Sequence, residues 1–201
     1  MANISTGRIQ RELREIVTSE EHKDDIISIK VVQEEDFSRL KGEIQGPPGS
    51  PYAGGRYTLD IVIPETYPFN PPQVKFVTKI WHPNISSATG AICLDILKDQ
   101  WAAAMTLRTV LLSIQVLLNS AEPDDPQDAV VAKQYKSDYK TFYQTAKHWA
   151  KVHAGANVDE LSDLDDKIKQ LTEMGFKEAE ARIALSSHSW DVDKAVEQLT
   201  S

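Results

Sequence analysis

The sequence predicts an α+β domain followed by a small all-α unit. Between residues 26 and 77, apolar and polar residues alternate with the period of strands, whereas the flanking segments carry apolar residues at helical spacing. The order is one helix, four strands, an irregular stretch and then helices, which is typical of α+β folds. The final segment, residues 163–201, has a separate helix-only pattern after a change in composition.

Residues 4–18 are predicted to form an amphipathic N-terminal helix. Its apolar residues recur at helical spacing, and they are Ile9, Leu13, Ile16 and Val17. The opposite face of this helix carries three arginines, which are Arg8, Arg11 and Arg14.

Four strands come next in sequence order. They are expected over residues 26–32, 37–44, 56–63 and 74–77. The third is the clearest, because Tyr57, Leu59 and Ile61 alternate with polar residues, as in a half-buried strand. Glycine- and proline-rich turns separate the second strand from the third and the third from the fourth. Short links of this kind predict an antiparallel meander.

The remainder of the first domain is expected to be irregular and then helical. Residues 78–105 show little periodicity, whereas residues 106–119 are nearly all apolar and predict a helix in the centre of the core. Two further helices are expected over residues 127–136 and 138–152. We take residues 1–153 as this domain.

A composition shift then predicts a linker over residues 154–162, which permits either docking or independent motion of the last domain. That domain, residues 163–201, carries three short helical patterns, at 164–173, 178–186 and 191–200. Asp191 or Ser189 is the expected N-cap of the third.

Composition excludes several classes of function. The net charge is −8 and the isoelectric point about 5.1, which argue against nucleic acid or an anionic membrane as a partner. No segment approaches the roughly 20 apolar residues of a membrane span. One cysteine and the absence of a secretory leader favour a reducing compartment, the cytoplasm or the nucleus.

Cys93 is the only cysteine, so an intramolecular disulfide, a CxxC redox pair and a multi-thiolate zinc site are all excluded. It is either a buried apolar thiol or a nucleophile. Its context favours the nucleophile, because a Pro83-Asn84 turn and a Ser/Thr/Gly-rich loop precede it and can hold the Asn84 amide near the sulfur. No His–Asp relay is evident nearby, although a base from elsewhere in the fold leaves a thiol hydrolase open.

Three further residues have both a structural and a functional interpretation. For His82 we favour a structural role, in which its ring hydrogen-bonds the loop backbone. Asn84 either caps its turn, steadies the loop or stabilises an oxyanion. Asp125, preceded by Asp124, is either a solvated turn residue or an acid that orients an incoming amine and helps it to lose its proton.

Residues 1–153 resemble the ubiquitin-conjugating enzyme family. The segments that carry the resemblance are collinear: RIQRELREI, GPPGSPYAGGRY, IPETYPFNPPQVKF, KIWHPNIS, GAICLDIL, QWAAAMTL and PDDP. The resemblance implies that Cys93 holds ubiquitin as a thioester, that Asn84 supports the loop or an oxyanion, and that Asp125 positions the attacking lysine. Asp95 is similar to a second acid at the mouth of the site.

The same resemblance implies several contact surfaces. Leu112 and Ser113 match the helix face on which the donor ubiquitin folds back. On the N-terminal helix, Arg8, Arg11 and Arg14 match the face toward the activating enzyme. Phe69 and the loop of Ala102, Ala103 and Ala104 match the surface for ligases. This loop reads Ala-Ala-Ala where many members have Ser-Pro-Ala, which leaves the choice of ligase open. The resemblance also implies a cis bond at Tyr67-Pro68.

Residues 163–201 resemble a ubiquitin-associated (UBA) domain, through KIKQLTEMGF and AEARIALSSHSWDVDKAVEQL. The resemblance implies that Met174, Gly175, Phe176 and Leu199 contact ubiquitin. The alternative is that Met174 and Phe176 simply close a very small core.

Together these resemblances imply an enzyme that takes ubiquitin from the activating enzyme and transfers it to lysine amines, building polyubiquitin for proteasomal degradation. They imply no metal or cofactor, since ATP is spent by the activating enzyme. They also imply RING-type ligase partners and a monomer whose UBA domain keeps ubiquitin nearby. Three alternatives remain open: a non-catalytic ubiquitin-binding adaptor, a conjugating enzyme for a ubiquitin-like modifier, and a thiol hydrolase.

Overall fold

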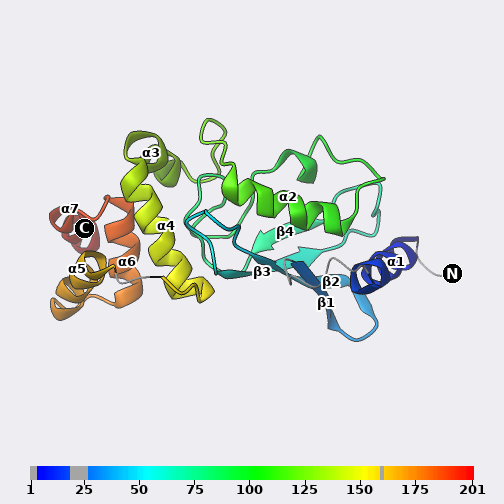
Figure 1. Ribbon diagram of the computed structural model, residues 1–201, viewed down its shortest axis with the longest axis horizontal. Coiled ribbons are helices and arrows are strands. Elements are labelled where there is room, and N and C mark those ends of the chain that lie inside the picture. The colour runs from blue at the N-terminus through cyan, green and yellow to red at the C-terminus, as the bar shows by residue number, and fades with distance from the viewer. Residues whose placement is uncertain (1–3, 19–26, 159–160) are drawn as a thin grey trace.

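The computed structural model describes residues 4–18, 27–158 and 161–201, which form two units (Figure 1). The first is a four-stranded sheet with helices, built around one hydrophobic cluster. The second is a bundle of three helices with its own cluster, which we call the C-terminal bundle (residues 161–201). The N-terminal helix and the C-terminal bundle lie at opposite ends of the molecule. The predicted α+β architecture with an all-α appendage is confirmed.

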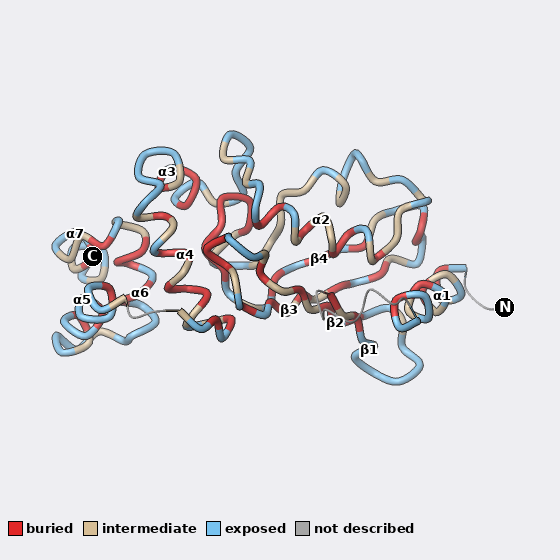
Figure 2. Tube along the Cα trace, viewed as in Figure 1, coloured by how far each residue is buried: buried red, intermediate tan, exposed pale blue. Residues whose placement is uncertain are grey.

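The sheet is an antiparallel meander in the order β1-β2-β3-β4, as predicted. Its strands are β1 (Ile27–Gln33), β2 (Asp36–Gln45), β3 (Arg56–Val62) and β4 (Gln73–Phe76). The alternation expected for β3 is present, because Tyr57, Leu59 and Ile61 are all fully buried. Figure 2 shows buried stretches along the sheet and along the helix above it. Ile26, the first residue of the first predicted strand, lies outside the described residues.

Helix α1 (Ile4–Thr18) has the predicted bounds but not quite the predicted faces. Ile9 and Ile16 are buried, whereas Val17 is 75% exposed. The expectation that Val17 shares the apolar face was wrong, because it follows Ile16 by roughly 100° around the helix, in the last turn. Arg8, expected on the outer face, is half-buried beside Glu12.

Helix α2 (Leu107–Asn119) lies against the sheet, as its apolar sequence predicts. Thr106 is its N-cap and accepts a hydrogen bond from the Thr109 amide. Its buried side chains are Leu107, Val110, Leu111, Ile114, Leu117 and Leu118. The preceding irregular stretch contains one short 3₁₀ helix, η2 (Asp95–Leu97). Among the helices in the described ranges, none is long and apolar enough to cross a membrane.

The remaining helices are α3 (Ala129–Ser137), α4 (Tyr139–Ala154), α5 (Ser162–Glu173), α6 (Glu178–Ser187) and α7 (Val192–Thr200). Gly155, in the left-handed conformation, ends α4. Of the two N-caps considered for α7, Asp191 is the one that accepts from the Lys194 amide. Residues 159–160 of the predicted linker lie outside the described residues.

The C-terminal bundle is docked against α4 rather than held apart from it (Figure 1). The Trp149 indole on α4 donates to Ser186 Oγ over 2.9 Å, and the Trp190 indole donates to Thr145 Oγ1 over 2.8 Å. All four residues are buried. Of the two arrangements that the linker permits, the structure therefore has the docked one.

Candidate active site

Cys93 lies beside the His82–Asn84 turn, where the sequence places it. The loop between them folds back on itself, and the Cys93 amide donates to the Asn84 carbonyl over 2.9 Å. Gly90 permits this fold, because its φ is +76° and a Cβ there would lie 1.9 Å from the Phe76 carbonyl oxygen. Cys93 is left partly exposed and lines a cleft.

This cleft has a volume of about 820 Å³ and opens between α2, the Cys93 segment and the loop at residues 120–125. The residues expected at the catalytic centre and on the donor-ubiquitin face line it, namely Asn84, Cys93, Asp95, Leu112, Ser113 and Asp125. Leu112 and Ser113 come from one side of α2 and are partly buried. Asp95 is exposed, and its carboxylate accepts from the Ile96 amide at the start of η2.

Asn84 fastens the loop that carries Asp125. Its Oδ1 accepts from the Glu122 amide over 2.8 Å, and its Nδ2 donates to the carbonyls of Glu122 and Asp125, each over 2.9 Å. The side chain is 1% exposed. Because these bonds reach a loop 38 to 41 residues away, they favour loop support over capping of the residue's own turn.

His82 is a structural residue of the site. It is fully buried, its Nδ1 accepts from the Asn84 amide over 3.0 Å, and its Nε2 donates to the Leu117 carbonyl over 2.9 Å. Burial lowers the pKa of His82 to about 4, so the ring is neutral at pH 7. The expected hydrogen bonding to the backbone is thus present.

Two charged side chains approach the Cys93 sulfur. The thiol donates to Asp125 Oδ2 over 3.5 Å, and Lys98 Nζ lies 3.4 Å from the sulfur. The hydrogen bond to Cys93 raises the pKa of Lys98, and the Asp125 and Asp99 carboxylates add to this effect. The neighbouring Asp124 turns away and pairs with Lys136 over 2.6 Å. Of the two adjacent acids, Asp125 is therefore the one at the sulfur.

Lys98 was missed by the sequence reasoning. It comes directly after η2, and the Lys98 amide donates to the Asp95 carbonyl, which turns the side chain back toward Cys93. A 3₁₀ turn just after Cys93 was the signal that could have placed it.

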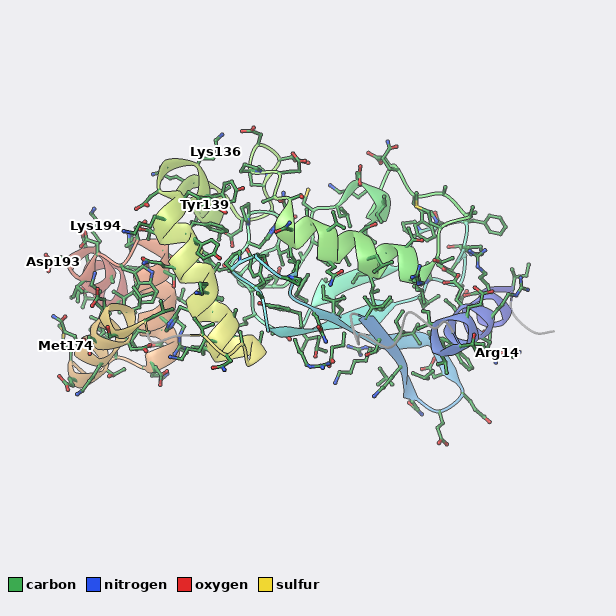
Figure 3. All side chains as sticks on the ribbon, viewed as in Figure 1. Arg14, Lys136, Tyr139, Met174, Asp193 and Lys194 are labelled. Atoms are coloured by element: carbon green, nitrogen blue, oxygen red, sulfur yellow. The ribbon has the colours of Figure 1, made fainter. Side chains whose placement is uncertain are left out.

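The surface expected to bind other proteins lies near the N-terminal helix. Phe69 is 70% exposed, and it comes after a cis Tyr67–Pro68 bond, as implied by the resemblance. The Trp101 indole donates to the Pro68 carbonyl over 2.8 Å, which brings the loop of Ala102, Ala103 and Ala104 beside this turn. Arg11 is exposed on α1, as is Arg14 (Figure 3).

Glu12 is a second residue that the sequence reasoning missed. It is 3% exposed, and it accepts hydrogen bonds from Arg8, from the Tyr67 hydroxyl over 2.6 Å and from the Leu107 amide over 2.7 Å. Arg8 also donates to the Met105 carbonyl over 3.0 Å. An acid between the apolar positions of α1 was the available signal. Its contacts join α1, the cis-proline turn and the start of α2.

In the C-terminal bundle, the residues expected to bind ubiquitin divide into two groups. Met174 is 55% exposed and projects from the bundle (Figure 3). Gly175 has a φ of +98°, which a side chain would strain. Phe176 and Leu199 are half-buried against the bundle's own hydrophobic cluster. Met174 is thus available to a partner, whereas Phe176 also closes the small core.

Comparison with known proteins finds two matching family models. The model described as ubiquitin-conjugating enzyme matches residues 8–150, and the model described as UBA/TS-N domain matches residues 164–199. Ubiquitin-conjugating enzyme E2 K of Homo sapiens is 62% identical over 201 residues, which cover 100% of each chain. Ubiquitin-conjugating enzyme E2-22 kDa of Drosophila melanogaster is 58% identical, also over 100% of each chain.

Two solved structures are similar to the first domain. One is the E2 domain of a Toxoplasma gondii ubiquitin-conjugating enzyme, with a TM-score of 0.68 and 53% identity, covering 74% of this chain and 98% of that one. The other is a putative ubiquitin-conjugating enzyme from Plasmodium yoelii, with a TM-score of 0.71 and 51% identity, covering 77% and 97%.

Proposed function

The chain belongs to the ubiquitin-conjugating enzyme family, and on that premise we propose that Cys93 carries ubiquitin as a thioester, which a lysine amine then attacks. The protein is a transferase, and its C-terminal bundle is a UBA domain. The observation that carries the proposal is the position of the Cys93 sulfur, which is partly exposed in the cleft and 3.5 Å from the Asp125 carboxylate.

In the first step, the Cys93 sulfur attacks the thioester carbonyl carbon of ubiquitin held by the activating enzyme. A new carbon–sulfur bond forms, and the activating enzyme's thiol leaves. In the second step, a neutral lysine amine attacks the same carbon, an isopeptide bond forms, and Cys93 leaves as the thiol. Asp125 is placed to accept a hydrogen bond from the amine and to hold it in line for attack.

The other residues of the cleft take supporting roles in this proposal. Asn84 holds the Asp125 loop by its three hydrogen bonds. Asp95 adds negative charge at the mouth of the cleft, which favours approach of a cationic lysine side chain. Leu112 and Ser113 form the α2 wall against which the donor ubiquitin would lie.

The enzyme acts together with ubiquitin, the activating enzyme and ubiquitin ligases. We further propose that its ligases are of the RING type and bind at Phe69 and Ala103, while Arg8 and Arg11 contact the activating enzyme. Products would be polyubiquitin chains for the proteasome, made by a monomer in the cytoplasm or nucleus. The exposed Met174, with Gly175, Phe176 and Leu199, would hold a further ubiquitin and raise its local concentration.

A charging assay tests the proposal. The full chain is mixed with ubiquitin, the activating enzyme and ATP, and analysed on a non-reducing gel. We expect a band heavier by one ubiquitin, which thiol reductant removes. In Cys93→Ser the band should resist reductant, because an oxygen ester replaces the thioester, or be absent. If neither ubiquitin nor any ubiquitin-like modifier charges the protein, the enzyme assignment fails and a ubiquitin-binding adaptor remains.

A further inference from the structure

The Gln134 side chain on α3 joins the catalytic domain to the C-terminal bundle through a single amide. Its Oε1 accepts from the Trp81 indole over 2.8 Å. Its Nε2 donates to the Ser186 carbonyl over 3.1 Å and to Ser189 Oγ over 3.2 Å. Gln134 is only 4% exposed. One buried amide is therefore shared between a tryptophan of the catalytic domain and the α6–α7 turn, which we define as residues 186–191.

On the catalytic side, this amide reaches the active-site turn. Trp81 directly precedes His82, Pro83 and Asn84 in the chain. The Pro83 carbonyl accepts from the amides of Gln127 and Asp128, over 2.9 and 3.0 Å, at the start of α3. The start of α3 is thus bonded to the active-site turn, and Gln134 within the same helix is bonded to the tryptophan that precedes this turn.

On the bundle side, the α6–α7 turn is strained and is stabilised by its docking. Ser189 and Trp190 have φ values of +53° and +64°, a left-handed conformation that is unfavourable for residues other than glycine. Both indole bonds that hold the turn cross the domain boundary, from Trp149 to Ser186 and from Trp190 to Thr145. The Trp149 ring also packs on the Trp81 ring, with centroids 5.1 Å apart.

We propose that Gln134 is a positioning residue, through which docking of the C-terminal bundle holds the active-site turn and the Asp125 loop in the geometry needed for transfer. The UBA domain then has a second role, which is separate from binding ubiquitin. The surface expected to bind ubiquitin supports this separation, because Met174 remains 55% exposed in the docked arrangement. The inference rests on the proposed function of Cys93.

Loss of docking would weaken the hydrogen bond that holds the Trp81 indole. A buried amide with all its partners has one orientation, and each bond polarises the next. When the α6–α7 turn leaves, Gln134 Nε2 loses both acceptors and is free to rotate toward water. Trp81 then loses a fixed acceptor for its indole, and the active-site turn beside it gains freedom of motion.

The test is single-turnover discharge of ubiquitin from Cys93 of the full chain to free lysine, an acceptor that does not involve the ubiquitin-binding surface. Gln134→Glu keeps an acceptor for Trp81 but replaces the donor with a carboxylate facing the Ser186 carbonyl. The double variant T145V/S186A removes the acceptors of both indoles and leaves every partner of Gln134 in place. Gln33→Glu, at an exposed glutamine at the end of β1, is the matched control. Hydrogen exchange of residues 186–191 reports docking.

We expect faster exchange of the α6–α7 turn in Gln134→Glu and in T145V/S186A. Both should lower the rate constant of discharge at saturating lysine by roughly 2- to 30-fold, the range of coupling between distant sites. The lysine concentration that gives half of the maximal rate, and the rate of charging, should be unchanged. Gln33→Glu should match the wild type. Normal charging of each variant also shows that its catalytic domain is folded.

Three results would overturn the inference. Discharge at the wild-type rate in variants with an exposed turn would show that docking does not affect the active site. If the turn opens in both variants but only Gln134→Glu discharges slowly, Gln134 acts within the catalytic domain and its effect does not depend on docking. A turn that stays protected in Gln134→Glu would show that Gln134 does not hold the domains together. A wild-type chain that never charges would instead contradict the proposed function.

Discussion

The Asp125 carboxylate lies 3.5 Å from the Cys93 sulfur, although 32 residues separate the two in the chain. The chain between them cannot fix this distance by itself. Helix α2 is regular, but irregular segments lie between Cys93 and α2 and between α2 and Asp125. The distance is set instead by Asn84, which bonds the Asp125 loop on one side and, through its carbonyl, the Cys93 amide on the other. One asparagine therefore sets the spacing of nucleophile and acid.

Removal of the Asp125 charge should slow transfer without affecting charging. In Asp125→Asn the side chain keeps its shape but no longer attracts an amine or accepts its proton. We expect discharge to free lysine to fall by roughly 10²-fold, the lower end of the range for a lost acid–base group. Rates of thioester formation and discharge, measured separately, check this. Asp124→Asn is the control, since Asp124 pairs with Lys136 in solvent and should discharge normally.

Substitution of Asn84 distinguishes loop support from stabilisation of an oxyanion. Asn84→Ala removes three hydrogen bonds to backbone groups, at about 1 kcal/mol each, so the free energy of unfolding should fall by about 1–3 kcal/mol. Discharge should fall with it, and amide exchange at residues 122–126 should rise. An unchanged loop with discharge reduced by roughly 10²- to 10³-fold would instead indicate a lost oxyanion donor.

The pattern in the sequence was sufficient to predict the sheet and the helices, but not the contacts between residues that lie far apart in the chain. The period-two alternation of β3 and the apolar run of α2 each determine a local structure and its buried face, so their positions could be predicted. The role of Asn84 could not be chosen from the sequence, because its partners are 38 and 41 residues away.

The same limit applies to residues that the sequence reasoning passed over. Lys98 and Gln134 are ordinary surface residue types, and only the folded chain brings one to the sulfur and buries the other between domains. Val17 shows the reverse error, since an apolar residue at the end of an amphipathic helix was assigned to its buried face. Helical spacing does not tell where the covering surface stops.

Stability should decrease as the pH falls from about 6.5 to about 4. Burial lowers the pKa of His82 to about 4 in the folded chain, whereas the unfolded value is near 6.5. In this window the unfolded chain binds a proton that the folded chain does not, so unfolding is favoured as the pH falls. The contribution of His82 to the free energy of unfolding is fully present above about pH 6.5, and it is fully lost by about pH 4. The full loss is on the order of 3 kcal/mol.

Urea unfolding between pH 4 and pH 7 measures this dependence. His82→Gln should have a smaller slope with pH than the wild type, because the titrating ring is gone. His148 behaves in the same way, since burial, with Arg182 nearby, lowers its pKa to about 4. A double variant in which both His82 and His148 are replaced by glutamine should therefore have a still smaller slope of stability with pH. An equal slope in wild type and His82→Gln would show that the ring remains accessible to protons.

Glu12 should affect ligase-stimulated transfer more than basal transfer, because its bonds join α1 to the Tyr67 turn and to the start of α2, away from Cys93. In Glu12→Gln the amide keeps the volume but weakens bonds that were made to a charge, so unfolding should become easier by about 1–3 kcal/mol. The turn before Phe69 and the loop of Ala103 would lose their common support. We expect discharge to lysine alone to stay near the wild-type rate, while its stimulation by a RING-type ligase falls several-fold. Glu15→Gln, on the exposed side of α1, is the control. Equal losses of basal and stimulated discharge would show that Glu12 supports the whole domain rather than the ligase surface.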